Sequence, residues 1–145
     1  MKAALIVLSI FLVIVHADNF ESQVQLYSSN GSSVVITNNW GLHLGTDQAN
    51  TFTAVITADG ELYLRGSDKY SNAYVTAAGT TGSGLQLGPQ QTSVFTTFQL
   101  GLQNGYTTLY SVSAKQYVRA TPDGVLSADG GDTAGDNALF TLKML

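Results

Sequence analysis

The stretch Lys115-Gln116-Tyr117-Val118-Arg119-Ala120-Thr121-Pro122-Asp123-Gly124-Val125-Leu126-Ser127-Ala128 holds two short runs of β-branched, aromatic and aliphatic residues around a turn. Val118 and Leu126 are the apolar centres of the two runs. Pro122-Asp123-Gly124 between them has the residue types that tight turns favour. The pattern therefore predicts a strand, a turn and a second, antiparallel strand.

The same unit recurs twice upstream. Ser33-Val34-Val35 precedes Gly41-Leu42-His43-Leu44, and Ala73-Tyr74-Val75 precedes Gly84-Leu85-Gln86-Leu87. The valines at 35, 75 and 118 are 40 and 43 residues apart, and the leucines at 42, 85 and 126 are 43 and 41 apart. A fixed period of this length indicates a repeated structural unit.

Each unit also opens and closes on a further apolar alternation. The openings are Leu26, Leu64 and Leu109; the closings are Ala54 with Ile56, Phe98 with Leu100, and Phe140 with Leu142. No segment beyond the N-terminus has sustained helical periodicity, and Asn-Gly and Asp-Gly turn signals separate the runs. We therefore expect an all-β chain with three repeats of about four strands, at about residues 22–60, 61–103 and 104–145.

Three repeats are too few for a propeller, which needs at least about four blades. A closed threefold barrel is the better solution, because closure removes exposed strand edges. Leu109-Tyr110-Ser111, the 115–128 stretch, Gly135 and Phe140-Thr141-Leu142 together resemble a fascin-type β-trefoil repeat. The second repeat matches more loosely, and the first has Val34 at the Tyr position and Ala54 at the Phe position. The resemblance implies a β-trefoil domain.

The N-terminus has the parts of a secretory signal peptide: Lys2, an apolar run from Ala3 to Val15, and small residues that suit cleavage after Ala17. The run is shorter than the roughly 20 residues of a membrane-spanning helix. We expect a signal peptide over residues 1–17, a single domain over 18–145 and an extracellular protein. Actin, the partner of some fascin-type trefoils, is therefore disfavoured.

The charge and cysteine content of the chain exclude further classes of partner and chemistry. The chain has six basic and ten acidic residues, and loss of Lys2 with the signal peptide leaves five basic residues and a formal net charge of −5. This charge disfavours nucleic acid and anionic membranes as partners. With no cysteine in the sequence, the fold has no disulfides and no thiolate chemistry.

Trp40 is the leading candidate for ligand binding. It lies in Asn38-Asn39-Trp40-Gly41, the turn of the first unit, where aromatic rings and amides suit sugar rings and hydroxyls. The alternative is that Trp40 folds back and plugs the barrel. Tyr70, in the segment Asp68-Lys69-Tyr70-Ser71-Asn72, is a second candidate contact.

Other polar residues carry weaker signals. His43 alternates with two leucines, is expected on the outer face of a strand, and lacks a catalytic partner at readable spacing. Asp123, Asp129, Asp132 and Asp136 fall in a glycine-rich region where turns explain them better than calcium does. Asn30-Gly31-Ser32 is a glycosylation sequon as well as a turn signal.

The sequence thus favours a secreted, non-enzymatic binding protein without cofactor or metal, carbohydrate-binding in the first place and with glycans as partner. The ricin-type Gln-x-Trp signature is missing, so no ricin-type sugar site is carried over. The alternatives are a protein-binding trefoil, such as a protease inhibitor that uses the Lys69-Tyr70 segment, and a structural component of an extracellular matrix.

Overall fold

The computed structural model describes residues 19–77 and 84–145. The predicted signal peptide and its cleavage position after Ala17 lie outside the described residues, as do residues 78–83 of the turn expected between Val75 and Gly84. No helix in the described ranges is long and apolar enough to cross a membrane.

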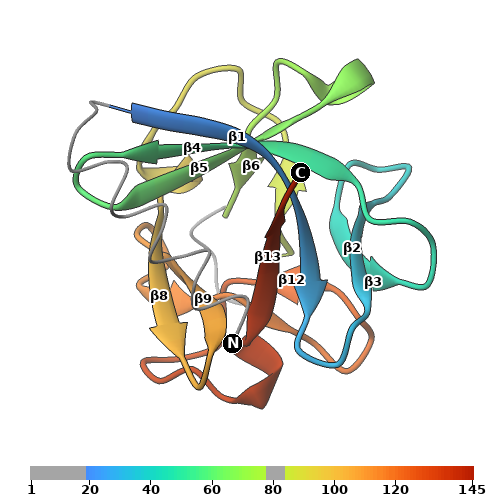
Figure 1. The fold of residues 1–145 in the computed structure, drawn as a ribbon, viewed down its shortest axis with the longest axis vertical. Coiled ribbons are helices and arrows are strands. Elements are labelled where there is room, and N and C mark those ends of the chain that lie inside the picture. The colour runs from blue at the N-terminus through green and yellow to red at the C-terminus, as the bar shows by residue number, and fades with distance from the viewer. Residues whose placement is uncertain (1–18, 78–83) are drawn as a thin grey trace.

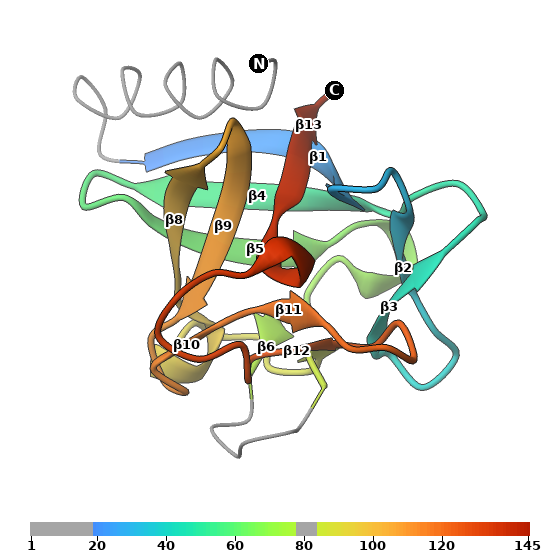
Figure 2. The same ribbon diagram turned by 90° about the horizontal axis from the view of Figure 1, so that it is seen from below.

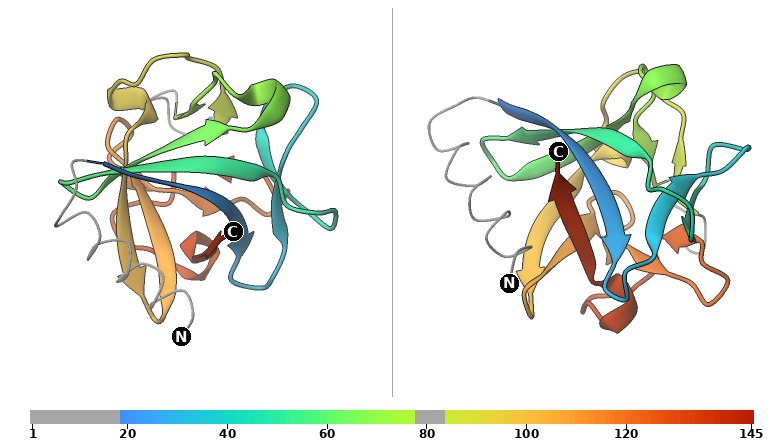
Figure 3. Two further views of the ribbon diagram at one scale, coloured as in Figure 1. Left: turned by 45° about the horizontal axis from the view of Figure 1, so that its top comes forward. Right: turned by 45° about the vertical axis from the view of Figure 1, so that its right-hand side comes forward.

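Six antiparallel strands of the described chain form a closed barrel. They are β1 (Asn19–Ser28), β4 (Thr51–Thr57), β5 (Glu61–Gly66), β8 (Phe98–Gln103), β9 (Tyr106–Ser111) and β13 (Phe140–Met144). Each pairs with the next, and β13 pairs with both β9 and β1, which closes the ring. The first and last strands consequently lie side by side (Figures 1 and 3). The expectation of an all-β fold is confirmed.

Shorter strands connect the barrel strands. Three hairpins are formed by β2 (Ser33–Ile36) with β3 (Leu42–Gly45), β6 (Val75–Thr76) with β7 (Gln86–Leu87), and β11 (Arg119–Ala120) with β12 (Leu126–Ser127). β10 (Gln116–Tyr117) extends the sheet beside β9. Single 3-10 turns occur at η1 (Asp68–Tyr70), η2 (Val94–Thr96) and η3 (Asp136–Ala138). Figure 2 shows β6, β11 and β12 together below the barrel strands.

The three hairpins meet through equivalent backbone contacts. The Leu42 amide donates to the Leu85 carbonyl at 2.9 Å, and the Leu85 amide donates to the Leu126 carbonyl at 2.8 Å. Single bridges link Gly41 with Gln86, Gly84 with Ser127, and Val125 with His43. Each hairpin thus uses the same position to contact the next, which gives the junction a pseudo-threefold arrangement. The leucine period seen in the sequence marks this junction.

Barrel pairing fixes which core residues correspond. Leu26, Leu64 and Leu109 face Leu142, Ala54 and Leu100 across the strands, so these leucines are equivalent. Phe140, Phe98 and Phe52 face Ser28, Ser111 and Gly66 in the same way. The assignment of Ala54 to the Phe position of the first repeat is therefore wrong, because Phe52 occupies it and is fully buried.

The valine that the period places in the core of the first hairpin is also the wrong one. Val34 faces Leu44 and is fully buried, as Val75, which faces Leu87, is in the second hairpin. Val35 lies on the opposite face and is half-buried. The repeating core valine is therefore Val34 and not Val35, and Ser33 takes the place of the tyrosines that precede Val75 and Val118.

Candidate functional site

The turn that carries Trp40 is held by its own residues. The Thr37 amide donates to the Gly41 carbonyl at 2.8 Å, and the Trp40 amide donates to the Thr37 carbonyl at 2.9 Å. The Thr37 hydroxyl accepts from the Gly41 amide at 3.2 Å and donates to Asn39 Oδ1. Trp40 itself adopts a left-handed backbone conformation, with φ of 67°. The turn therefore fixes Trp40 at its most strained position.

The equivalent turn of the third repeat shows what this position normally requires. There the Thr121 amide donates to the Val125 carbonyl and the Gly124 amide to the Thr121 carbonyl, both at 2.8 Å. The Thr121 hydroxyl again accepts from the last amide of the turn, at 3.1 Å. Gly124 has φ of 89° and corresponds to Trp40. A bulky residue thus stands where the same turn elsewhere in the molecule uses glycine, and bulky residues rarely adopt positive φ.

The Trp40 ring packs on the molecular surface and is not enclosed in the barrel. Its side chain is 40% exposed, and its ring meets that of Tyr70 edge to face, with centroids 5.0 Å apart and planes at 87°. Edge-to-face pairing is a favourable geometry for aromatic rings. The structure therefore brings together two residues that the sequence singled out separately, from different repeats.

Tyr70 is the buried member of the Trp40–Tyr70 ring pair. It ends η1, is 8% exposed and belongs to the hydrophobic core. A Cβ atom at Gly66 would collide with Tyr70, so glycine at the end of β5 allows η1 to close on the barrel. Lys69 places its ammonium 5.1 Å from the Tyr70 ring centroid, within cation–π range. Tyr70 thus orients Trp40, and the exposed aromatic surface is that of Trp40.

Two hollows border the Trp40–Tyr70 pair. One of about 410 Å³ lies at the hairpin junction and includes Asn39 and Gly41, the neighbours of Trp40, in its lining. The other, of about 510 Å³, is lined by Gln48, Ala49, Asn50, Thr51, Ser67, Asp68, Lys69 and Tyr70. Asn38 is exposed, and its side chain makes no hydrogen bond to any described residue, whereas the Asn39 oxygen is used inside the turn. Amide, hydroxyl, carboxylate and ammonium groups therefore line the two hollows, and Trp40 itself lines neither.

His43 packs between two hairpins. Its Nδ1 donates to the Leu44 carbonyl at 2.5 Å, and its ring covers Gly124, where a Cβ would come within 2.7 Å of Cε1. The histidine is half-buried, so it is less exposed than the strand alternation predicts. Its contacts are those of a packing residue at the junction of two hairpins.

The aspartates of the third repeat do not converge. Asp129 accepts two hydrogen bonds from Arg119, Nε to Oδ1 at 2.8 Å and Nη2 to Oδ2 at 3.2 Å. These bonds lower the pKa of the Asp129 carboxyl and raise that of Arg119. Asp123, Asp132 and Asp136 are exposed. In the described ranges, no three His, Asp or Glu side chains lie close enough together to hold a metal ion.

Asn30 occupies the turn between β1 and β2. Its side-chain oxygen accepts from the Ser28 hydroxyl and from the Ser32 amide, the latter at 3.2 Å. The residue is exposed, and these bonds use the oxygen and leave the nitrogen that glycosylation modifies. Glycosylation at Asn30 stays a prediction.

Comparison with known proteins bears on the fold. No protein-family model matches the sequence, and a search of curated proteins found no match. Among solved structures the chain is similar to ThreeFoil, a designed threefold-symmetric protein, with a TM-score of 0.71 and 16% sequence identity over 85% of this chain and 99% of that one. The fold is of the β-trefoil type. At this identity the likeness extends to the fold alone, so it supports a trefoil and leaves a fascin-type relationship as a resemblance of sequence.

One group of residues that the barrel brings together has no distinctive sequence signal. Gln99 on β8, Thr108 and Tyr110 on β9 and Tyr117 on β10 surround a hollow of about 380 Å³. Thr108 and Tyr110 flank the buried Leu109 in the strand alternation, although Thr108 is itself buried. Tyrosines in such positions are common in strands, so the pattern alone gave no reason to select these two.

Proposed function

We propose that this chain is a secreted, non-enzymatic carbohydrate-binding protein in which Trp40 stacks on a sugar ring. The observation that carries the proposal is the conformation of Trp40, a bulky residue held at positive φ and 40% exposed at a position where the third repeat has Gly124. Strained residues of this kind cluster at functional sites. Packing alone gives no reason for tryptophan there, because glycine completes the same turn in the same fold.

The surroundings of Trp40 suit a hydroxyl-rich ligand. An indole face offers flat apolar surface, and the amide of the neighbouring Asn38 can exchange hydrogen bonds with hydroxyl groups. Tyr70 holds the indole from its edge, which reduces the side-chain entropy lost on binding. The ligand-binding residues in this proposal are Trp40, Asn38 and Asn39, with Tyr70 as the support that positions Trp40.

The test is a glycan array probed with residues 18–145 and with two variants. Trp40→Ala removes the proposed stacking surface, and Phe95→Ala removes a different aromatic side chain of similar exposure, 47%. We expect a defined class of glycans to bind the unchanged protein and the Phe95 variant but not the Trp40 variant. Absence of binding across the array, or binding that survives Trp40→Ala, would contradict the proposal. Secretion is checked separately by sequencing the N-terminus of the exported protein, which we expect to begin at Asp18.

Protein binding is a second candidate because of a different surface. Val94 and Phe95 on η2 are 49% and 47% exposed, and Ser93 and Thr96 cap this turn reciprocally, so both apolar side chains are presented rigidly. The Lys69-Tyr70 segment gives less support to loop-insertion inhibition, since Tyr70 is buried. A pull-down from extracellular medium that depends on Phe95 and not on Trp40 would favour this candidate.

A further inference from the structure

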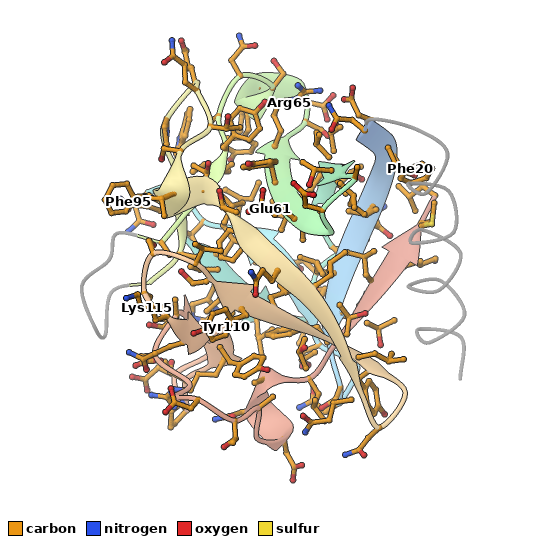
Figure 4. All side chains as sticks on the ribbon, turned by 90° about the vertical axis from the view of Figure 1, so that its left-hand side faces the viewer. Phe20, Glu61, Arg65, Phe95, Tyr110 and Lys115 are labelled. Carbon is orange, nitrogen blue, oxygen red and sulfur yellow. The ribbon has the colours of Figure 1, made fainter. Side chains whose placement is uncertain are left out.

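The outer wall of the barrel has a hollow of about 380 Å³ between β8 and β9. Its residues belong to the second and third repeats, whereas Trp40 belongs to the first. The lining of the hollow consists of Gln99, Leu100, Gly101, Thr108, Tyr110 and Tyr117. Figure 4 shows Tyr110 on this face of the molecule. None of the six residues is charged, and the lining combines two phenol rings, a threonine hydroxyl and an amide. This is the composition expected of a site for a neutral, polar ligand.

Two features shape the hollow. The rings of Tyr110 and Tyr117, which face each other on β9 and β10, meet edge to face with centroids 5.2 Å apart. Gly101 lies within β8, and a Cβ there would come within 2.5 Å of the Thr108 hydroxyl oxygen. Glycine inside a strand often marks a close approach of another group. Here it leaves room for the Thr108 hydroxyl beside the tyrosine pair.

The polar groups around this hollow are unused. Among the described residues, no hydrogen bond involves the side chains of Gln99, Thr108, Tyr110 or Tyr117. Gln99 is exposed, Tyr110 and Tyr117 are half-buried, and Thr108 is 4% exposed. Several donors and acceptors that converge on one hollow match the hydroxyl pattern of a sugar or polyol.

The two equivalent walls of the barrel serve as internal comparisons. Beside β13, the Tyr27 hydroxyl, at the position of Tyr110, donates to Gln25 Oε1 at 3.1 Å, and Gln25 Nε2 donates to the Ala49 carbonyl at 3.2 Å. Beside β4, Arg65 takes the position of Tyr110 and pairs with Glu21 at 3.3 Å. At the position of Tyr110, both walls thus pair the polar group within the protein, whereas the Tyr110 hydroxyl makes no hydrogen bond to a described residue. The hydroxyls of Tyr63 and Tyr74, which meet edge to face on the β4–β5 wall, make none either.

We propose that the β8–β9 wall is a binding site for neutral, hydroxyl-rich rings, separate from the site around Trp40. Tyr110 supplies the aromatic contact, with Tyr117 supporting it, and Gln99 and Thr108 exchange hydrogen bonds with ligand hydroxyls. This site does not depend on Trp40. With two sites, one molecule would bridge two glycan chains.

The experiment is a nitrogen-15 NMR titration of residues 18–145 with four neutral probes: methyl α-mannoside, methyl β-galactoside, N-acetylglucosamine and maltotriose. We expect at least one probe to shift the amides of β8, β9 and Tyr117. Gln99→Ala, an exposed change that leaves the fold intact, and Tyr110→Phe each remove one hydrogen-bonding group. Each should weaken the affinity measured at these amides by about 3- to 10-fold. Tyr27→Phe is the matched control and should leave it unchanged.

The Trp40→Ala variant separates this site from the one proposed above. We expect it to keep the β8–β9 shifts and their affinity. If no probe shifts these amides, or if Gln99→Ala and Tyr110→Phe bind as the unchanged protein does, the site is refuted. Loss of the β8–β9 shifts in Trp40→Ala would likewise refute a separate site. Shifts at β8–β9 alone, with none around Trp40, would support this site and contradict the Trp40 proposal.

Discussion

Trp40 adopts a left-handed backbone conformation, which is unfavourable for residues other than glycine. At positive φ the Cβ atom crowds the following carbonyl, at a cost of about 1–2 kcal/mol for residues other than glycine. The turn bonds of Thr37 and the contact with the Tyr70 ring hold the residue there. A selective advantage of the exposed indole would explain why the strain persists, and the size of the strain can be measured.

We predict that Trp40→Gly is more stable than Trp40→Ala by about 1 kcal/mol. Both variants lose the indole, but only alanine keeps a Cβ at positive φ, and alanine in such a conformation destabilises a protein. The measurement is the free energy of unfolding in urea. Asn38, whose backbone is not left-handed, provides the control pair, in which glycine should be the less stable variant. Equal stability of the two Trp40 variants would show that the turn carries no strain.

Thr107 destabilises the fold for a different reason, an unpaired buried hydroxyl. It is fully buried, and within the described ranges its hydroxyl is the buried side-chain oxygen without a hydrogen-bond partner. It faces Phe140, as Val24 faces Phe52 and Leu62 faces Phe98 in the other repeats. The threonine therefore occupies a core position that is apolar in the two equivalent places.

We predict that Thr107→Val stabilises the protein by about 1 kcal/mol, because it removes an unpaired buried hydroxyl and keeps the side-chain shape. The check is a higher urea midpoint with an unchanged slope. Thr96→Val is the control: Thr96 is equally buried, but its hydroxyl accepts from the Ser93 amide at 2.9 Å. That change should destabilise the protein, and stabilisation in both variants would contradict the explanation.

At the scale of elements, the sequence predicts the hairpins better than their register. The leucines at 42, 85 and 126 mark the hairpin junction, and those at 26, 64 and 109 occupy equivalent barrel positions. The Ala54 assignment failed because residues two apart share a face of a strand, so alternation cannot separate Ala54 from Phe52. At Val34-Val35 two apolar neighbours point to opposite faces, and the pairing with Leu44 decides between them.

Some features of the candidate site could be predicted from the sequence, and others required the tertiary structure. Trp40 could be selected from sequence because it is a lone aromatic residue in an amide-rich turn. Its contact with Tyr70 joins different repeats, and the correspondence with Gly124 requires the hydrogen bonds of both turns. The β8–β9 hollow depends on side chains from three strands, so it follows from the pairing of β8, β9 and β10. Local patterns thus predict turns and strands, whereas the relations between them arise from tertiary packing.

The third hairpin contains an ion pair that makes a prediction about pH. Hydrogen bonds from Arg119 on β11 lower the pKa of Asp129, which follows β12. A carboxyl whose pKa is lower in the folded state contributes stability above its unfolded value, near 3.9, and loses it as the pH falls through the folded value. We expect the unchanged protein to exceed Asp129→Asn in stability by about 1 kcal/mol at pH 6. That advantage should shrink as the pH falls below about 4 and disappear once the folded Asp129 carboxyl is protonated.

The readout is the free energy of unfolding of both proteins across this pH range. Asp123→Asn serves as the control, because Asp123 is exposed in the turn of the same hairpin. Its difference from the unchanged protein should stay small at every pH. A constant difference for Asp129→Asn between pH 6 and pH 2 would show that the pair does not contribute through ionisation.

At the scale of the whole molecule, the repeats are not independent units. β4 pairs with β5, β8 with β9 and β13 with β1, so each closing strand is paired with the opening strand of another repeat. The hairpins also bond to one another through the backbone of Leu42, Leu85 and Leu126. No repeat can bury its core face without the others, and no disulfide links the cysteine-free chain. The stability of the fold therefore depends on closure of the whole barrel.

This closure predicts a single cooperative unfolding transition for residues 18–145. Far-ultraviolet circular dichroism reports all strands, whereas Trp40 fluorescence reports the contact between the first two repeats. The two signals should give the same urea midpoint and slope, because opening any one interface opens the ring. A fragment of residues 18–60 should stay unfolded, since β1 and β4 would lack their partners β13 and β5. Separate midpoints, or a folded fragment, would show that the first repeat is stable on its own and that closure only joins preformed units.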